Sequence, residues 1–426
     1  MAWQGREFIG CVAVATACGM TMLNPGSIYG QYGQGPLPPL PTRTTTTGTA
    51  PETNVVPSLS VAERYDSNVF FVQGGNLEDY VSTVSPQVRV FHKRQLIEGM
   101  VGGGATAEAY VKNPGLNYLA GNGMVNLNLD RAMGELVRGL GLRVFDTYIY
   151  TPQPLAFASP VGGNEAPESF VQGIQARRAN SHTNTGRVEA SFAPSPVLSF
   201  ITTYTDLRRT YGSSASTSTG VAQGNLIDTT FQTVRSGPEV KISPVDTGTL
   251  YYQYQRGSYS TSDFSAHGAL AGWTRSITPT LTAGVTGGAT VFSTSNNLQY
   301  LGSAFLAWKG EDSNVTVSYS RRITPSFYVV STALLTQVVS GTVTHQVTKS
   351  LALSLNSNYA HSQSVPDSSL ITFESYSVMP SVSYEINRVM VATLSYTHSQ
   401  YQRTSSSQEF LFDRNIVLLR LVAEWE

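Results

Sequence analysis

The stretch that decides the fold is Leu351-Ala352-Leu353-Ser354-Leu355-Asn356-Ser357-Asn358-Tyr359, in which apolar and small polar residues alternate. Side chains of a β-strand point alternately to its two faces, whereas an amphipathic helix places its apolar residues three and four positions apart. One face of this segment therefore carries three leucines and a tyrosine, and the other carries alanine, serine and asparagine. The pattern predicts a strand with one apolar and one polar face.

The same period of two recurs along most of the chain, for example in the segments that begin at Leu281, Val315 and Met390. Most segments keep it for about ten residues, which suits a tilted strand across a bilayer, whereas strands of soluble sandwiches average about five to six. The polar face is small and mostly neutral, as suits a wet interior. The sequence therefore predicts an all-β fold, a transmembrane antiparallel up-and-down β-barrel.

About eighteen strands are expected, within a range of 16–18, starting near residues 55, 80, 96, 116, 135, 184, 197, 227, 248, 264, 280, 298, 314, 328, 350, 371, 389 and 412. Tight turns, among them Arg131–Glu135 and Thr348–Ser350, alternate with longer links such as 151–183. Bacterial outer-membrane barrels have short periplasmic turns and long extracellular loops, and an even strand count places both termini in the periplasm. We expect that location and orientation here.

Three of the expected strands carry a proline on the apolar side: Pro86, Pro238 and Pro380. Proline removes one hydrogen bond from the strand ladder and usually marks a bulge or an edge. We expect a bulge, or a local relaxation of the barrel, at each of the three; the alternative is that these segments are not strands.

Composition supports this class of protein. Of the 426 residues, 13% are charged, about half the share in ordinary soluble proteins, so a large water-exposed surface is disfavoured. The net charge of −1 gives no indication of a nucleic-acid-binding protein.

The N-terminus has the pattern of an export signal: a short start containing Arg6, an apolar run from Phe8 to about Leu23, and then Asn24-Pro25-Gly26. We predict a signal peptide over 1–30, a Pro- and Thr-rich linker over 31–53 and the barrel over 54–426. The alternatives are a membrane anchor and a lipoprotein signal ending at Cys18. Both cysteines, Cys11 and Cys18, lie within the predicted signal, so the mature chain would have no thiol for a disulfide, metal site or nucleophile.

No catalytic, metal or cofactor site is indicated by the sequence. The six histidines are far apart and lack metal-ligand spacing, and the glycine run Gly102–Gly104 lies within a strand pattern rather than before a helix. We predict that the protein is not an enzyme and binds no cofactor.

Charged residues on the polar faces are the candidate functional residues. If the apolar faces contact lipid, the following point inward: Arg89, Arg143, Arg187, Arg235, Lys241, Arg322, Arg420, Glu98, Glu108, Glu189, Glu239 and Glu385. A barrel of this size can hold an aqueous channel, and inward charges tune which solutes pass. The alternative is that these charges only pair across the wall and hydrate the lumen. The link 151–183 is predicted either to fold into the pore or to remain a surface loop.

Aromatic residues near strand ends on the apolar side form a candidate girdle at the level of the lipid headgroups. The candidates are Phe200, Tyr204, Trp308, Tyr359, Tyr396 and Trp425.

Several short patches also resemble a known family. Val61–Phe70, Asp79–Pro86, Ser318–Arg322, Pro325-Ser326 and Ser340–Val343 are similar to segments of outer-membrane β-barrels linked with exopolysaccharide systems, including those associated with PEP-CTERM sorting. The resemblance implies a role in exporting a polysaccharide, with polysaccharide and periplasmic secretion components as partners.

The final segment, Asn415–Glu426, resembles the C-terminal signal by which outer-membrane barrels are recognised for assembly. It departs from that pattern because its aromatic residue, Trp425, is penultimate. The implied partners are the barrel assembly machinery and outer-membrane lipid, and no nucleic acid. The leading hypothesis is an outer-membrane channel that assists polysaccharide export. The alternatives are a general diffusion porin for small solutes and a non-conducting structural or adhesive barrel.

Overall fold

The computed structural model describes residues 52–70, 77–152, 180–212, 227–259, 263–293, 295, 297–326, 333–365, 371–405 and 409–425. Within these ranges the chain forms eighteen strands, one helix, α1 (Asp130–Leu136), and one 3-10 turn, η4 (Pro114–Leu116). The strands are β1 (Glu52–Asp66), β2 (Asp79–Lys93), β3 (Glu98–Tyr110), β4 (Tyr118–Asn128), β5 (Leu140–Thr151), β6 (Ser181–Phe192), β7 (Leu198–Tyr211), β8 (Thr229–Lys241), β9 (Asp246–Tyr259), β10 (Asp263–Thr278), β11 (Leu281–Phe292), β12 (Leu298–Lys309), β13 (Ser313–Pro325), β14 (Ala333–Thr348), β15 (Leu351–Val365), β16 (Ile371–Glu385), β17 (Met390–Ser405) and β18 (Glu409–Glu424).

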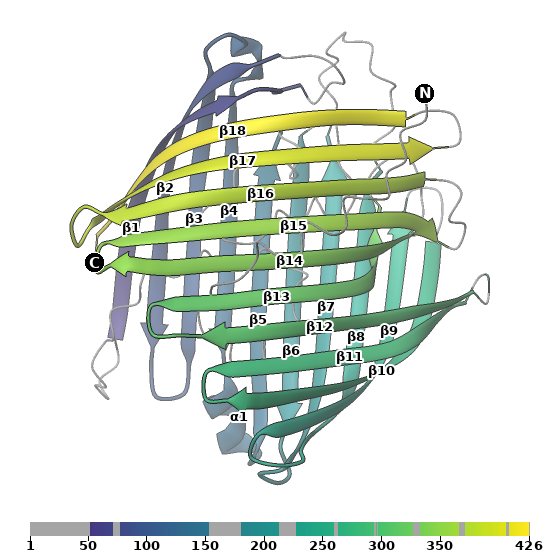
Figure 1. Ribbon diagram of the computed structural model, residues 1–426. Helices are drawn as coiled ribbons and strands as arrows, with labels where there is room; N and C mark the ends of the chain where they lie inside the picture. The colour runs from purple at the N-terminus through teal and green to yellow at the C-terminus, as the bar shows by residue number, and fades with distance from the viewer. Residues whose placement is uncertain are drawn as a thin grey trace.

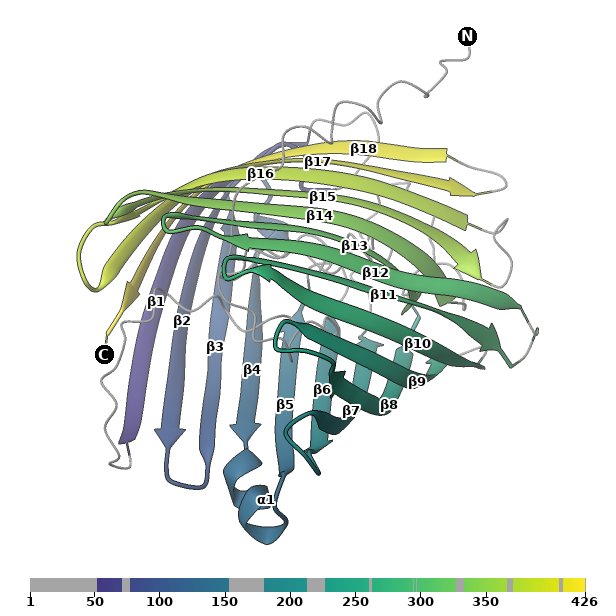
Figure 2. The ribbon, with the colours of Figure 1, turned by 60° about the horizontal axis from the view of Figure 1, so that its bottom comes forward.

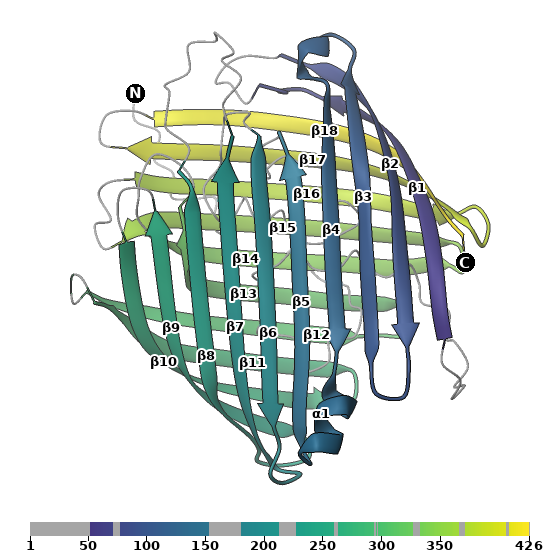
Figure 3. The ribbon, with the colours of Figure 1, turned by 180° about the vertical axis from the view of Figure 1, so that it is seen from behind.

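The eighteen strands close into one barrel. Each strand pairs antiparallel with its neighbours in sequence, and β1 pairs with β18 from Ser58↔Glu424 to Asp66↔Ile416. In Figures 1 and 3, β10–β18 cross one side of the barrel at a steep angle to β1–β9 on the other side, as tilted strands of a closed sheet do. The predicted all-β barrel of about eighteen strands is confirmed.

The two ends of the barrel differ. One end, which we call the turn end, carries the link β2–β3 and every second link after it; these are two to five residues long except β4–β5, which contains α1. The opposite end, which we call the loop end, carries the other links, among them the three longest, 67–78, 152–180 and 212–228. The first described residue, Glu52, pairs with Lys93 at the turn end, and the N–H of Glu424 bonds the Val389 carbonyl there. Both ends of the barrel segment therefore lie at the turn end. The predicted signal peptide and nearly all of the linker fall outside the described residues.

The predicted tight turn Arg131–Glu135 is wrong, because these residues lie in α1, and β5 starts at Leu140 rather than near 135. Figure 2 shows α1 just beyond the ends of β4 and β5. The segment from Asp130 to Leu136 contains arginine, alanine, methionine, glutamate and leucine and no β-branched residue, a composition that favours a helical turn. No helix among the described residues is long and apolar enough to cross a membrane.

The three prolines produce no bulge, contrary to the first of the two expectations. Residue pairs are missing on one side of Pro86, Pro238 and Pro380, but the pairing resumes beyond each without a shift in register. Because the register is continuous past each proline, these three strands keep the same two faces on both sides of it.

In every strand the exposed large apolar side chains lie on one face. The exception is Phe91 of β2, which is exposed on the opposite face. Cross-strand partners share a face, and the pairing around the ring joins these faces into one surface. Tyr259 belongs to the opposite face, and its hydroxyl accepts a hydrogen bond of 3.3 Å from the N–H of Ser326, four strands away. Contact between strands that are not neighbours requires the inside of the barrel, so the exposed apolar face is the outer one.

Candidate functional site: the barrel lumen

All the charged residues predicted to point inward lie on the inner face. The register places Arg89, Arg143, Arg187, Arg235, Lys241, Arg322, Arg420, Glu98, Glu108, Glu189, Glu239 and Glu385 opposite the exposed apolar face of their strands. Their effect on solute selectivity stays a prediction.

Several of these side chains form ion pairs along the wall. Arg89 bonds Glu424 across the closure between β1 and β18. Glu189 lies between Arg187, which it bonds, and Arg143, at 3.6 Å. Arg143 also donates to Asp130 of α1 at 2.7 Å. The alternative that the inward charges pair with one another along the wall therefore holds for some of them.

Arg235 has a neutral partner instead. It donates to Oε1 of Gln253 on the adjacent strand, at 2.6 and 3.2 Å. This arginine lies near the middle of β8, so its charge sits at mid-height in the lumen.

A second ionic network of four side chains lies on the inner face near the loop end of β18, β1 and β3, and of these only Glu108 was predicted from the sequence as an inward charge. Arg64 donates to both oxygens of Glu108, at 3.2 and 2.9 Å. Asp66 accepts from Arg414 at 2.9 Å and lies 3.9 Å from Arg64. All four side chains are at most 3% exposed.

This network joins the first strand to the last, because Asp66 belongs to β1 and Arg414 to β18. The alternation of charge, Glu108, Arg64, Asp66 and Arg414, gives each ion an opposite neighbour, which a buried charge requires. Strand periodicity places these residues inward, but only the closure of the barrel brings positions 66 and 414 together.

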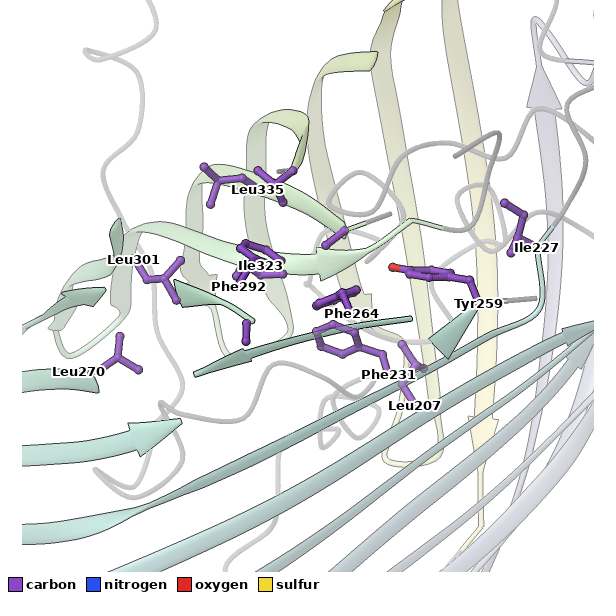
Figure 4. Close-up of a cluster of buried hydrophobic side chains, with 13 residues drawn as sticks. Leu207, Ile227, Phe231, Tyr259, Phe264, Leu270, Phe292, Leu301, Ile323 and Leu335 are labelled. Atoms are coloured by element: carbon purple, nitrogen blue, oxygen red, sulfur yellow. The ribbon is translucent and has the colours of Figure 1, made fainter. Parts of the chain in front are cut away.

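The opposite wall of the lumen carries a buried apolar cluster near the loop end (Figure 4). Phe264 is at its centre, with ring centroids 6.0 Å from Phe231, 6.1 Å from Tyr259 and 5.6 Å from Phe292. All four rings stand on the inner faces of β8–β11.

Two further members of the cluster show that the end of the β13–β14 hairpin turns into the lumen. Ile323 and Leu335 are paired on the face that is outward elsewhere in these strands, yet both have 0% exposure and join the same cluster as Phe264 and Phe292. The contact between Ser326 and Tyr259 fixes this end against β9. The hairpin therefore narrows the lumen at the loop end.

The sequence held a signal for this inward turn. Ala333-Leu334-Leu335 breaks the alternation with three apolar residues in a row, which is typical of a strand buried on both faces. The link 151–183, predicted either to fold into the pore or to remain a surface loop, lies mostly outside the described residues.

The six predicted girdle residues all project from the outer face or its edge. Phe200, Trp308 and Trp425 lie near the turn end, whereas Tyr204, Tyr359 and Tyr396 lie further along their strands. Their contact with lipid headgroups stays a prediction.

The histidines also belong to the outer face. His361 lies 3.0 Å from Glu374, and His182 and His267 each bond a tyrosine hydroxyl at 2.6 Å. Within the described part of the chain no group of three or more His, Cys, Asp or Glu could hold a metal ion.

Residues 296–425, which include β12–β18, match the family model described as "Putative beta-barrel porin 2". No curated protein matches the sequence. Among solved structures, OccK3 (OpdO) of Pseudomonas aeruginosa has 11% identity and a TM-score of 0.41, covering 88% of this chain and 96% of its own. OccAB3 of Acinetobacter baumannii has 10% identity and a TM-score of 0.43, covering 88% of this chain and 99% of its own. The siderophore receptor PirA of P. aeruginosa has 8% identity and a TM-score of 0.42, covering 88% of this chain and 81% of its own.

These structural similarities are too low to carry an argument about function. The porin model covers less than a third of the chain, in its C-terminal strands. Together with the closed barrel and its apolar outer face, that match indicates a porin-like barrel of the outer membrane.

Proposed function

We propose that the protein is an outer-membrane channel through which small polar solutes diffuse. The observation that carries this proposal is the pair of faces on the eighteen-stranded barrel: an apolar outer surface and an inner surface of polar and charged side chains. An apolar outer band suits lipid, and a polar interior suits water.

The barrel has room for a water-filled path. Eighteen strands spaced about 4.8 Å apart and tilted by about 40° give a backbone diameter of roughly 35 Å. Side chains reduce this width, and the inward β13–β14 hairpin reduces it further at the loop end. A narrowed lumen of this kind favours small solutes over folded proteins.

Single-channel recording tests the proposal. Purified barrel in a planar bilayer should give stable conductance steps of nanosiemens order. A folded wild-type barrel that conducts no current would contradict the channel.

Export of a polysaccharide is the more specific function implied by the family resemblance. One structural feature favours it: hydroxyl pairs line the inner wall of β13–β17, including Ser318–Ser340 at 2.6 Å and Ser383–Thr393 at 3.1 Å. Such a wall can exchange hydrogen bonds with sugar hydroxyls. Trapping of polymer in the periplasm of a deletion strain, relieved by the wild-type gene, would support export; unchanged surface polysaccharide would contradict it.

A further inference from the structure

The charges of the barrel wall are unevenly divided between its two faces. Thirteen basic side chains lie on the inner face of the strands: Arg64, Arg89, Lys93, Arg143, Arg187, Arg209, Arg235, Lys241, Lys309, Arg322, Arg403, Arg414 and Arg420. Eight acidic side chains described on that face oppose them: Asp66, Asp79, Glu98, Glu108, Glu189, Glu239, Glu385 and Glu424. The inner wall therefore has five more cations than anions.

The outer face has the opposite balance. Four arginines, Arg208, Arg256, Arg275 and Arg321, stand there with seven described acids: Glu63, Asp146, Asp206, Asp246, Asp263, Glu374 and Asp413. The whole chain is close to neutral, with a net charge of −1. The fold thus places an excess of basic side chains on the inner face and an excess of acidic side chains on the outer face, although the chain as a whole is nearly neutral.

The excess lies on the inner faces of β7–β18. The inner faces of β1–β6 carry five basic and five acidic side chains, which include the Arg64–Glu108 and Arg187–Glu189 pairs. The inner faces of β7–β18 carry the other eight basic and three acidic side chains. Arg235, Arg322 and Arg420 belong to this second set.

Other parts of the chain have too little charge to reverse the balance. The connections outside the described residues contain, by sequence, Glu165, Glu168, Arg177, Arg178 and Asp367, a net of −1. Glu52, the first residue of β1, adds one more acid by sequence. A net positive charge remains.

We infer that the lumen prefers small anions, such as carboxylates and phosphates, over cations. This inference rests on the proposed channel and names its class of solute. The physical basis is the distance over which the field of the wall charges extends. The Debye length is about 10 Å in 0.1 M salt, comparable to the distance from the wall to the axis of a lumen of this size. Field focusing between walls of low dielectric raises the local concentration of ions of the opposite sign.

Reversal potentials across a tenfold KCl gradient test the inference, with chloride and potassium as the probes. We expect wild-type barrel to show a chloride-to-potassium permeability ratio of about 3 or more near 0.1 M salt. The ratio should approach 1 near 1 M salt, where the Debye length is about 3 Å.

A matched pair of variants assigns the effect to the inner face. Gln253→Glu adds a negative charge inside, where the side chain accepts hydrogen bonds from Arg235, and Gln337→Glu adds one outside, where the side chain accepts from Tyr319 at 3.3 Å. In both, the new carboxylate keeps the acceptor oxygen. Gln253→Glu and Arg235→Gln should each lower the ratio by about 1.5-fold, whereas Gln337→Glu should leave it unchanged.

The outcomes separate the two proposals. A conducting barrel with a ratio of 1 or less would overturn the anion preference and leave the channel standing. An equal fall in the Gln253→Glu and Gln337→Glu variants would overturn the role of the inner face. A folded barrel without conductance would overturn the channel and the preference together.

Discussion

Removal of the Asp66 carboxylate is the sharpest perturbation of the barrel closure. Asp66 accepts hydrogen bonds from Arg414 at 2.9 Å and from the N–H of Asn68 at 3.2 Å, and its side chain is 1% exposed. Asp66→Ala would leave two buried arginines, Arg64 and Arg414, without this carboxylate. Breaking one partner of a buried ion pair costs about 3–5 kcal/mol, so we expect a loss of that size in the free energy of unfolding.

The exposed pair Arg256–Asp263 supplies the control. Its atoms are 3.4 Å apart and its side chains are 52% and 56% exposed, so Asp263→Ala should cost about 0–1 kcal/mol. Urea unfolding of the refolded barrel in lipid vesicles, followed by tryptophan fluorescence, measures both variants.

A double variant separates charge from packing. Asp66→Leu with Arg414→Met removes both ions, and apolar replacements of a buried pair are often neutral or stabilising, so part of the loss should be recovered. A cost for Asp66→Ala within about 1 kcal/mol of that for Asp263→Ala would refute the reasoning.

Three further variants test other parts of the account. Leu335→Ala removes a fully buried side chain of the inward hairpin, so it should lower the free energy of unfolding by about 2–5 kcal/mol and raise single-channel conductance. Leu353→Ala, on the outer face, is the control and should leave conductance unchanged. Equal conductance in the two variants would contradict the narrowing of the lumen by the hairpin. Gly139→Ala should destabilise by about 1 kcal/mol or more in the same urea assay, because Gly139 has φ of 84° and a Cβ would lie 2.3 Å from the Ala193 carbonyl oxygen. Gly115→Ala, where a Cβ meets no atom within 4 Å, is its control, and equal costs would contradict the strain. Trp425→Ala should lower the yield of heat-modifiable barrel in cells but not the stability of refolded protein if the last strand is the assembly signal; an unchanged yield would argue against that role.

The eighteen strands could be predicted from the sequence because the barrel wall is a repeated local pattern. Each strand, such as β15, contacts lipid on one side and water on the other, so apolar and polar residues alternate within its own sequence. The same rule predicted which charged residues point inward. The α1 turn was missed because a seven-residue helix lies between two strands and leaves the rest of the pattern intact.

Contacts between distant strands could not be predicted in the same way. The partner of Asp66 is Arg414, and only closure of the ring places them together. Ile323 and Leu335 follow the outward phase of their strands, so the phase alone predicts contact with lipid, whereas packing against Phe264 and Phe292 turns them into the lumen. The uneven charge of the two faces depends on the complete register, since most single strands carry three charges or fewer and several, such as β4 and β15, carry none.

Labelling of neighbouring cysteines in β15 tests the central claim most directly. Leu353 is 41% exposed on the apolar face, and Ser354, on the inner face, has its Oγ 2.5 Å from that of Ser381. In membrane-embedded barrel, a charged, water-soluble maleimide should label Ser354→Cys, and Leu353→Cys should react only with a lipid-soluble reagent. Labelling of Leu353→Cys by the water-soluble reagent, with Ser354→Cys reacting only with the lipid-soluble one, would contradict the assignment of the apolar face to lipid and the polar face to the lumen.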